Sequence, residues 1–176
     1  EGVDLFSKGN LIYTRRIGGA PSTFPVLGEN ETVNDYPSSV NIINALKFSG
    51  RTNGDLGIGV LNAITQETTT EITNTETNET RTEVVEPVAN YNVLVLDQRI
   101  RDNSSISFVN TSVMRNGDFR DANVSALFFD LNTKKNTYSV DGDFNYSIVN
   151  NYGNQDNTQG YNTTLRFAKT SGKFRG

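Results

Sequence analysis

The feature that most constrains this chain is an alternation of apolar and polar residues with a period of two. In the segment 137–148 the even-numbered positions read Tyr, Val, Gly, Phe, Tyr and Ile, whereas the odd-numbered positions read Thr, Ser, Asp, Asp, Asn and Ser. Successive side chains of a β-strand point to opposite faces, so this segment predicts a strand with one apolar and one polar face. The pattern recurs in 125–131, 161–167 and 56–60. Around 91–100 apolar residues occupy both faces, and the orientation of that strand stays open.

The spacing of these segments predicts a meander of long strands. We expect eight strands, near 10–19, 40–52, 56–66, 86–101, 104–115, 123–132, 137–149 and 160–171, and Lys173-Phe174-Arg175 would begin another. Most of these segments are close to the ~9–11 residues that a tilted strand needs to cross a bilayer, whereas strands of soluble sheets have roughly 5–6 residues. Short turns alternate with longer polar links at 20–39, 65–86, 115–122 and 150–160, which we expect to be extracellular loops.

These patterns predict an all-β fold, an antiparallel up-and-down transmembrane β-barrel, as a single segment over residues 1–176. In hydrocarbon every unpaired backbone group is costly, and only closure of the sheet removes its edges. The chain begins with acidic and apolar residues and ends as a new strand would start. We therefore expect an incomplete segment of a larger barrel in a bacterial outer membrane.

Composition narrows the function. A net charge of −4 argues against nonspecific nucleic-acid binding, which needs a basic surface. The absence of Cys and His removes disulfides, thiolate metal sites and the commonest general base. No apolar run approaches the ~18 residues of a transmembrane helix. We expect neither an enzyme nor a cofactor.

Several blocks resemble a known family of envelope proteins. The opening Glu1-Gly2-Val3-Asp4-Leu5-Phe6 and the following Leu11-Ile12-Tyr13-Thr14-Arg15-Arg16-Ile17-Gly18 are similar to a block of Bacteroidota proteins that reads approximately E-G-x-D-x-F and then F-Y-S-R-R-I-G. The segments 45–52 and 56–63, and Val85-Glu86-Pro87 with Asn90-Tyr91, resemble later blocks of that family. The resemblance, which covers roughly residues 1–100 by motif, implies the first part of a C-terminal membrane-barrel domain of unassigned function. In that family an N-terminal sandwich resembling a family-nine carbohydrate-binding module precedes the barrel, so glycan binding would belong to a module that is absent here.

Alternation assigns candidate residues to two faces. Polar residues expected to face the lumen are Lys47, Asp141, Asp143, Asn145 and Arg166; residues expected to face lipid or form an aromatic girdle are Tyr138, Val140, Phe144, Tyr146, Ile148, Tyr161, Leu165 and Phe167. The paired aspartates at 141 and 143 lack the spacing of a calcium loop, and lumenal carboxylates balanced by Arg166 or Lys47 are the favoured interpretation. A sugar-stacking role for the tyrosines is the less favoured alternative.

Two further motifs are interpreted structurally. Arg15 and Arg16 would lie on opposite faces of the expected strand, so only one of them can point into the lumen, where it could pair acidic groups or a ligand. The favoured interpretation is an ion pair or a girdle residue near the strand end. Gly54, Gly57 and Gly59 lack the Lys-Ser/Thr of a phosphate loop, and glycines within strands predict bends or close packing inside the barrel.

The favoured function is that of a channel, a scaffold or an anchor. Its partners would be outer-membrane lipid and other envelope proteins. The first alternative is a soluble, secreted β-sandwich that binds a partner such as a glycan, with its apolar face packed against a second sheet. The second alternative, an envelope enzyme, finds no nucleophile motif in the chain.

Overall fold

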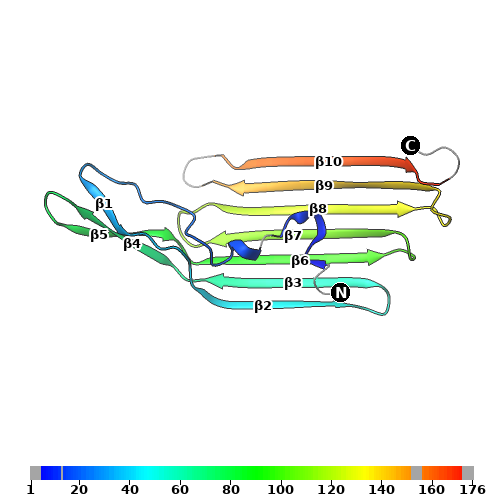
Figure 1. The fold of residues 1–176 in the computed structure, drawn as a ribbon, viewed down its shortest axis with the longest axis horizontal. Coiled ribbons are helices and arrows are strands. Elements are labelled where there is room, and N and C mark those ends of the chain that lie inside the picture. The colour runs from blue at the N-terminus through cyan, green and yellow to red at the C-terminus, as the bar shows by residue number, and fades with distance from the viewer. Residues whose placement is uncertain (1–4, 13, 152–155, 172–176) are drawn as a thin grey trace.

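The computed structural model contains ten strands in two antiparallel sheets (Figure 1). It describes residues 5–12, 14–151 and 156–171, without the side chain of Arg15; the strand expected to begin at Lys173-Phe174-Arg175 lies outside these ranges. None of the helical turns in the described ranges has the length and the apolar run that crossing a membrane as a helix requires.

The larger sheet has seven strands in the order β10-β9-β8-β7-β6-β3-β2. They are β2 (Ile42–Arg51), β3 (Leu56–Thr65), β6 (Ala89–Arg99), β7 (Ser105–Arg115), β8 (Asp121–Asn132), β9 (Tyr138–Asn150) and β10 (Thr158–Lys169). Every pair of neighbours is antiparallel, so the all-β, antiparallel part of the prediction is confirmed. Among the described residues β2 and β10 pair with one strand each and not with one another, and this sheet is not closed into a barrel.

The smaller sheet is formed within two of the long links, 20–39 and 65–86, that were expected to be extracellular loops. Its strands β1 (Glu31–Asp35), β4 (Thr68–Asn74) and β5 (Thr80–Glu86) pair in the order β1-β4-β5 and extend beyond one end of the larger sheet (Figure 1). The Thr-rich segment was interpreted as a polar loop, but threonine is β-branched and suits strands. Thr70, Ile72 and Val85 are buried in it. The link between β7 and β8, residues 116–120, is also shorter than expected.

The expected first strand near 10–19 is wrong. Residues 5–12 and 14–20, here called the N-terminal segment, contain two short 3-10 turns, η1 (Lys8–Asn10) and η2 (Thr14–Arg16), and lie across β3, β6, β7 and β8 (Figure 1). Gly9, Asn10 and Gly18 have positive φ angles of 65°, 54° and 76°, which interrupt an extended backbone.

The core lies between the N-terminal segment and the larger sheet. Leu5 and Phe6 pack with Leu61, Val95 and Val109, and all five are at most 8% exposed. Leu11, Ile12 and Ile17 pack against the same cluster from the N-terminal segment. The apolar positions that made this segment resemble a strand therefore cover one face of the sheet.

Candidate functional site

The five polar residues expected on one face do share a face of the larger sheet. The register places Asp141 opposite Arg166, whose Nη2 lies 2.6 Å from the Asp141 carboxylate and whose Nε donates to it at 2.7 Å. Asn145 donates its side-chain N–H to Asp143 at 2.6 Å. The structure thus brings four of the five together on β9 and β10. Whether this face borders a lumen stays a prediction.

Lys47 lies apart from that group, on edge strand β2. Its ammonium is 4.5 Å from the centre of the Phe6 ring, a geometry that favours a cation–π interaction. Lys47 therefore contacts the N-terminal segment, while the neighbour of Asp141 and Asp143 is Arg166.

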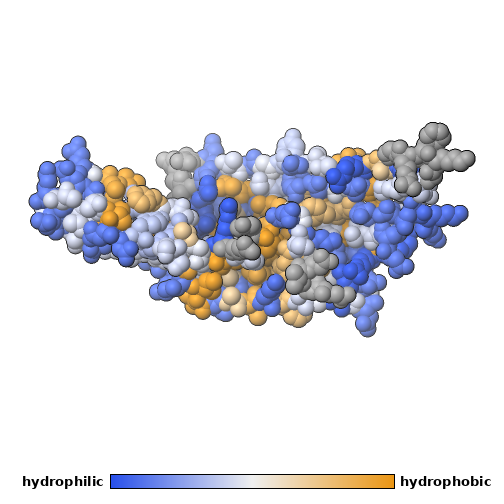
Figure 2. All heavy atoms as spheres, in the orientation of Figure 1, coloured by the Kyte–Doolittle hydropathy of each residue, from blue (hydrophilic) through white to orange (hydrophobic). Residues whose placement is uncertain are grey.

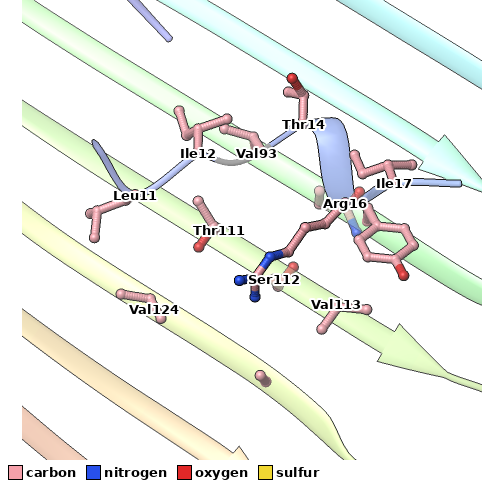
Figure 3. A pocket seen from close by; sticks show the side chains of 13 residues that line it. Leu11, Ile12, Thr14, Arg16, Ile17, Val93, Thr111, Ser112, Val113 and Val124 are labelled. Carbon is pink, nitrogen blue, oxygen red and sulfur yellow. The ribbon is translucent and has the colours of Figure 1, made fainter. Parts of the chain in front are cut away.

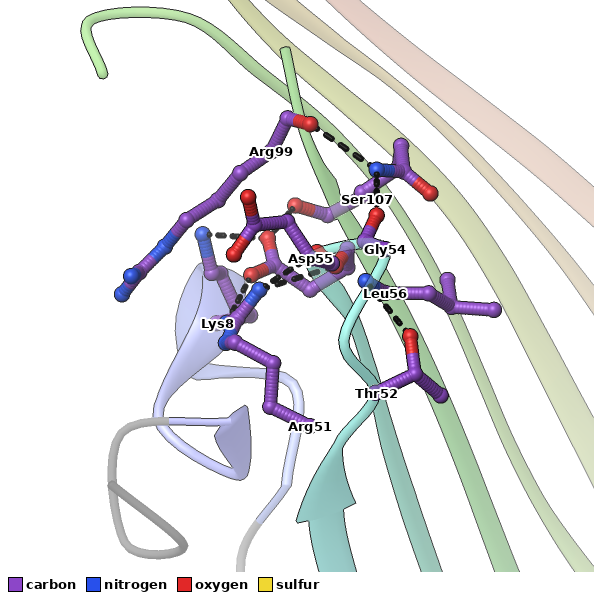
Figure 4. Close-up of polar contacts among 10 residues, drawn as sticks. Lys8, Arg51, Thr52, Gly54, Asp55, Leu56, Arg99 and Ser107 are labelled. Carbon is purple, nitrogen blue, oxygen red and sulfur yellow. Dashed lines mark hydrogen bonds and ion pairs between the residues drawn. The ribbon is translucent and has the colours of Figure 1, made fainter. Parts of the chain in front are cut away.

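A buried ionic cluster around Asp97 lies on the same face, and Figure 4 labels three of its members, Lys8, Arg51 and Ser107. The carboxylate is 4% exposed and accepts hydrogen bonds from Arg51 and from the Ser107 hydroxyl, each at 2.7 Å. Lys8 of the N-terminal segment lies 3.0 Å from Oδ1, the same oxygen that accepts from Ser107. Four segments distant in sequence therefore meet at one carboxylate, whose negative charge is compensated by two cations.

Glycines on β3 provide room for the N-terminal segment. A Cβ at Gly57 would lie 2.8 Å from Leu5, and one at Gly59 would lie 3.1 Å from the Phe6 ring. Both distances are shorter than ordinary van der Waals contact, so larger residues would displace the segment. This agrees with the prediction that strand glycines mark close packing.

The N-terminal segment lies over a hollow of about 210 Å³ on β6, β7 and β8 (Figure 3). Its walls include Leu11, Val93, Val113 and Val124, and the side chain of Arg16 reaches over it. A second cleft, of about 630 Å³, adjoins it and shares Arg16. Its lining adds Glu86 with Arg115 and Arg120.

Glu86 is a buried carboxylate with two partners. The Arg115 Nε donates to it at 3.3 Å, and the backbone N–H of Ser22 donates at 2.6 Å. Arg115 also donates to the carbonyl of Arg120. These contacts fix the wall of the cleft where the larger sheet meets the smaller one.

The opposite face of the larger sheet is apolar and uncovered. All eight residues expected there, Tyr138, Val140, Phe144, Tyr146, Ile148, Tyr161, Leu165 and Phe167, share it with residues of the other strands such as Leu46 and Phe48. Leu165, Phe167 and Leu46 are 72%, 68% and 62% exposed. No described element packs over this apolar face. The N-terminal segment lies on the polar face, which is the face turned towards the viewer in Figure 2. Tyr138 stacks on Phe167 with ring centres 6.0 Å apart.

The apolar residues form a diagonal band. On β2 the band contains Leu46 and Phe48, and the register aligns Phe48, strand by strand, with Tyr161 of β10. On β10 the large aliphatic and phenyl side chains are Leu165 and Phe167. Leu165 lies six residues beyond the position of β10 that the register aligns with Leu46. From Leu46 to Leu165, at ~3.4 Å per residue and ~4.8 Å per strand, this displacement of about 20 Å over about 29 Å is a slope of roughly 35°. Ile148 of β9 aligns with Leu46 itself, so the band is widest on β9.

Asparagines form a polar patch beside the band, towards the end that carries the smaller sheet. The Asn62 side chain donates to Asn90 and Asn92 at 2.7 and 2.8 Å, and the Asn110 side chain donates to Asn123 at 3.1 Å. These amides satisfy one another across the strands, which lowers the cost of an apolar environment.

A model of the family described as "Domain of unknown function (DUF5916)" matches residues 1–176. The chain belongs to this family. No curated protein and no solved structure matches it. The match agrees with the resemblance to a domain of unassigned function, and the DUF5916 description itself names neither an activity nor a location.

Sequence reasoning missed the central carboxylate of this DUF5916 chain. Asp97 lies in the segment whose orientation was left open, where Val93 and Val95 precede it on the same face. The alternation Val93, Val95, Asp97 was the available signal, since a carboxylate in line with buried valines needs a partner. No group of three or more potential metal-ligating side chains comes close enough to hold an ion within residues 5–12, 14–151 and 156–171.

Arg81 forms two ion pairs in the smaller sheet, one with Glu31 of β1 and one, at 2.6 Å, with Glu83 of its own strand β5. Glu31 of β1 accepts hydrogen bonds from Arg81 of β5 at 2.8 Å and from the backbone N–H of Gly28 at 2.7 Å. The Arg81 guanidinium and the Gly28 N–H together lower the pKa of Glu31 to about 2. The Glu31–Arg81 pair joins the two edge strands of the smaller sheet across β4.

Proposed function

We propose that this chain is a segment of an outer-membrane β-barrel that serves as a channel, a scaffold or an anchor in the bacterial envelope. The observation that carries the proposal is the uncovered diagonal apolar band on a sheet of long antiparallel strands. Its slope of roughly 35° is within the ~35–45° by which strands of membrane barrels tilt. A band that is horizontal in a membrane must cross tilted strands diagonally.

The height of the band supports the same proposal. On β9 the apolar face runs from Tyr138 to Ile148, which is about 34 Å along the strand at ~3.4 Å per residue. At a tilt of ~35–45° this length corresponds to about 24–28 Å along the membrane normal, against an apolar band of ~25 Å in membrane barrels. Tyr138 at one end and Tyr161 near the other suit the two aromatic girdles.

The opposite face suits a wetted interior. It carries the Asp141–Arg166 ion pair, the Asp97 cluster and the N-terminal segment, so the proposal places this segment against the inside of the wall. Lipid would satisfy the apolar face, and further strands would have to pair with β2 and β10 to satisfy the sheet edges. Lipid and other envelope proteins are the proposed partners, and no catalytic activity is proposed.

A soluble β-sandwich would require the apolar face to be covered by protein instead of lipid. It needs a second sheet about 10 Å from the apolar face. In the described residues the only second layer, the N-terminal segment, lies on the polar face. This arrangement favours the membrane proposal over the sandwich.

The test is the periodicity of solvent access around Phe144. The chain has no cysteine, so single cysteines can be introduced at Phe144 and Leu165 on the apolar face and at Asp143 and Thr164 on the polar face. Nitroxide labels at these positions would be measured in the full-length protein reconstituted into liposomes. Labels at Phe144 and Leu165 should be accessible to dissolved oxygen and protected from a water-soluble nickel complex, because oxygen concentrates in hydrocarbon.

Labels at Asp143 and Thr164 should show higher access to the nickel complex than their neighbours. A soluble full-length protein after carbonate washing of membranes, or equal nickel access at Phe144 and Asp143, would refute the proposal. Wild-type protein that migrates differently on gels before and after heating would serve as the folding control.

A further inference from the structure

The two ends of the larger sheet differ in charge. The short-turn end, formed by the turns 52–55, 99–104, 133–137 and 169–171, lies at the end of the sheet away from the smaller sheet (Figure 1). Its cations are Arg99, Arg101, Lys134, Lys135 and Lys169, and its carboxylates are Asp55 and Asp102. By contrast, the links that form the smaller sheet, 20–39 and 66–86, carry nine carboxylates and one arginine. The short-turn end is therefore the positive end of the sheet.

Two of these cations border the apolar band. Arg101 and Lys134 line one surface cleft together with Leu131, Val140 and Phe167, which belong to the apolar face. Both cations are exposed, and within the described residues neither forms an ion pair with a carboxylate. Two positive charges that no ion pair compensates thus lie at the edge of a surface that suits acyl chains.

The two turns that carry these cations are joined to each other. The Asn103 side chain, in the turn between β6 and β7, donates to the Thr133 carbonyl at 2.9 Å and to the Asn136 side-chain oxygen at 2.6 Å, both in the turn between β8 and β9. These bonds fix the backbone spacing between Arg101 and Lys134. Groups that are already held in place lose less entropy when a ligand binds between them.

We propose that this cleft binds an anionic glycerophospholipid, with the lipid phosphate between Arg101 and Lys134 and an acyl chain along Leu131, Val140 and Phe167. The inference rests on the proposed function, because it requires the apolar band to face lipid. It adds a lipid class and an orientation: the short turns of membrane barrels lie on the periplasmic side, so the lipid would belong to that leaflet.

A third cation continues the same rim on β10. The register pairs Lys169 with Tyr138, and alternation places Lys169 on the apolar face directly after Phe167. Tyr138 stacks on Phe167 at this end of the band. Tyrosines are enriched at the level of the lipid headgroups, and lysine and arginine side chains near the edge of an apolar region extend their charge towards that level.

The combination of charge and apolar surface favours a lipid over a soluble anion. A soluble anion would meet the two cations but would leave the apolar wall of the cleft exposed, whereas a phospholipid meets both. A headgroup with its own cation, such as phosphocholine, has no net charge to complement the rim. Phosphatidylglycerol, with one net negative charge and two acyl chains, has the required chemistry.

The test measures which lipid lies next to each end of the band. Single cysteines at Leu131, in the cleft, and at Ile148, on the apolar face at the other end of β9, would be labelled with bimane in the full-length protein. The protein would be reconstituted into phosphatidylcholine vesicles that contain increasing amounts of brominated phosphatidylglycerol or brominated phosphatidylcholine. Bromine quenches the label on contact, so the two quenching curves give the relative affinity of the adjacent lipid site.

At Leu131 phosphatidylglycerol should be preferred at least about fivefold, which is the contribution of one cation near an anionic membrane surface. At Ile148 the two lipids should quench about equally. The preference at Leu131 should also fall between about 0.05 and 0.5 M salt, because salt screens exposed charges.

Two double variants separate a lipid site from general attraction to a positive end. Arg101→Gln with Lys134→Gln should lower the preference at Leu131 to less than about twofold. Arg99→Gln with Lys135→Gln removes the same charges from the same end, but neither residue lines the cleft, and the preference should remain. Unchanged gel mobility before heating would show that each variant is folded.

The outcomes distinguish this inference from the proposed function. If brominated lipids quench neither label, the apolar face does not meet lipid, and both proposals fail. If both labels are quenched but Leu131 shows no preference for phosphatidylglycerol, or Ile148 shows the same preference, the lipid site is refuted and the membrane proposal stands. An equal loss of preference in the two double variants would likewise refute the site.

Discussion

Replacement of Asp97 by asparagine should lower the free energy of unfolding by about 3 kcal/mol. The carboxylate is 4% exposed and has three donors, from Lys8, Arg51 and Ser107, at 3.0, 2.7 and 2.7 Å. Loss of its charge leaves the Arg51 guanidinium, 14% exposed, without an anion, and an uncompensated buried charge costs about 3–5 kcal/mol. The lower end applies because Lys8 is 32% exposed and regains water.

The contribution of the N-terminal segment to this cluster is separable. Lys8→Met should cost only about 1 kcal/mol, because solvent screens this ion pair. In the double variant the two effects should fall short of additivity by about 1 kcal/mol, since residues in direct contact are coupled. Asp130→Asn, an exposed aspartate on β8, is the matched control and should change stability by less than about 0.5 kcal/mol.

The assay is urea unfolding of the full-length protein in detergent, followed by the fraction that keeps its heat-modifiable gel mobility. Hydrogen exchange of the N-terminal segment gives a local readout, and it should rise in Asp97→Asn and Lys8→Met. If Asp97→Asn lies within about 0.5 kcal/mol of the Asp130→Asn control, the reasoning about the buried cluster is wrong.

Three other outcomes follow from the contacts. Gly59→Val should release the N-terminal segment and raise its hydrogen exchange, because a Cβ there lies 3.1 Å from a buried ring. Gly54→Ala, where the nearest neighbour of a Cβ is 3.9 Å away, should not; similar exchange in both would contradict this. Phe144→Arg on the apolar face should destabilise the protein in lipid by about 2–4 kcal/mol, and Asn145→Arg on the polar face by much less; equal losses measured by urea unfolding would argue against lipid contact. Glu31, with its pKa lowered to about 2, should stabilise the smaller sheet fully above pH 4.5 and lose this contribution as the pH falls towards 2; an NMR titration midpoint near 4.5 would refute the ion pair.

The sequence by itself determined the long strands of the larger sheet and, except for the segment 91–100, their two faces. The side-chain period of a strand follows from backbone geometry alone, so the alternation at 137–148 placed Asp141 and Asp143 on one face and Phe144 on the other without any tertiary information. It also allowed Arg166 to be named as a partner of Asp141, and the ion pair is present.

Other features required contacts between distant segments. In the N-terminal segment apolar residues recur as they would in a strand. Whether such a segment adds a strand to the sheet or covers its face depends on the space left by Gly57 and Gly59 of β3, about fifty residues later. The segment 65–86 became strands because β1 and β5 pair with β4, and pairing is a property of two segments rather than of one.

Asp97 illustrates which features the sequence predicts and which features only the tertiary structure decides. The buried valines at 93 and 95 predict that Asp97 is buried as well, but burial of a carboxylate without partners is costly. Contacts with Arg51, Ser107 and Lys8, which come from three other segments, compensate this cost. Local alternation therefore decided which way each strand residue points, because it is fixed by the backbone. Tertiary structure decided what each face meets, because that depends on side chains brought together from distant parts of the chain.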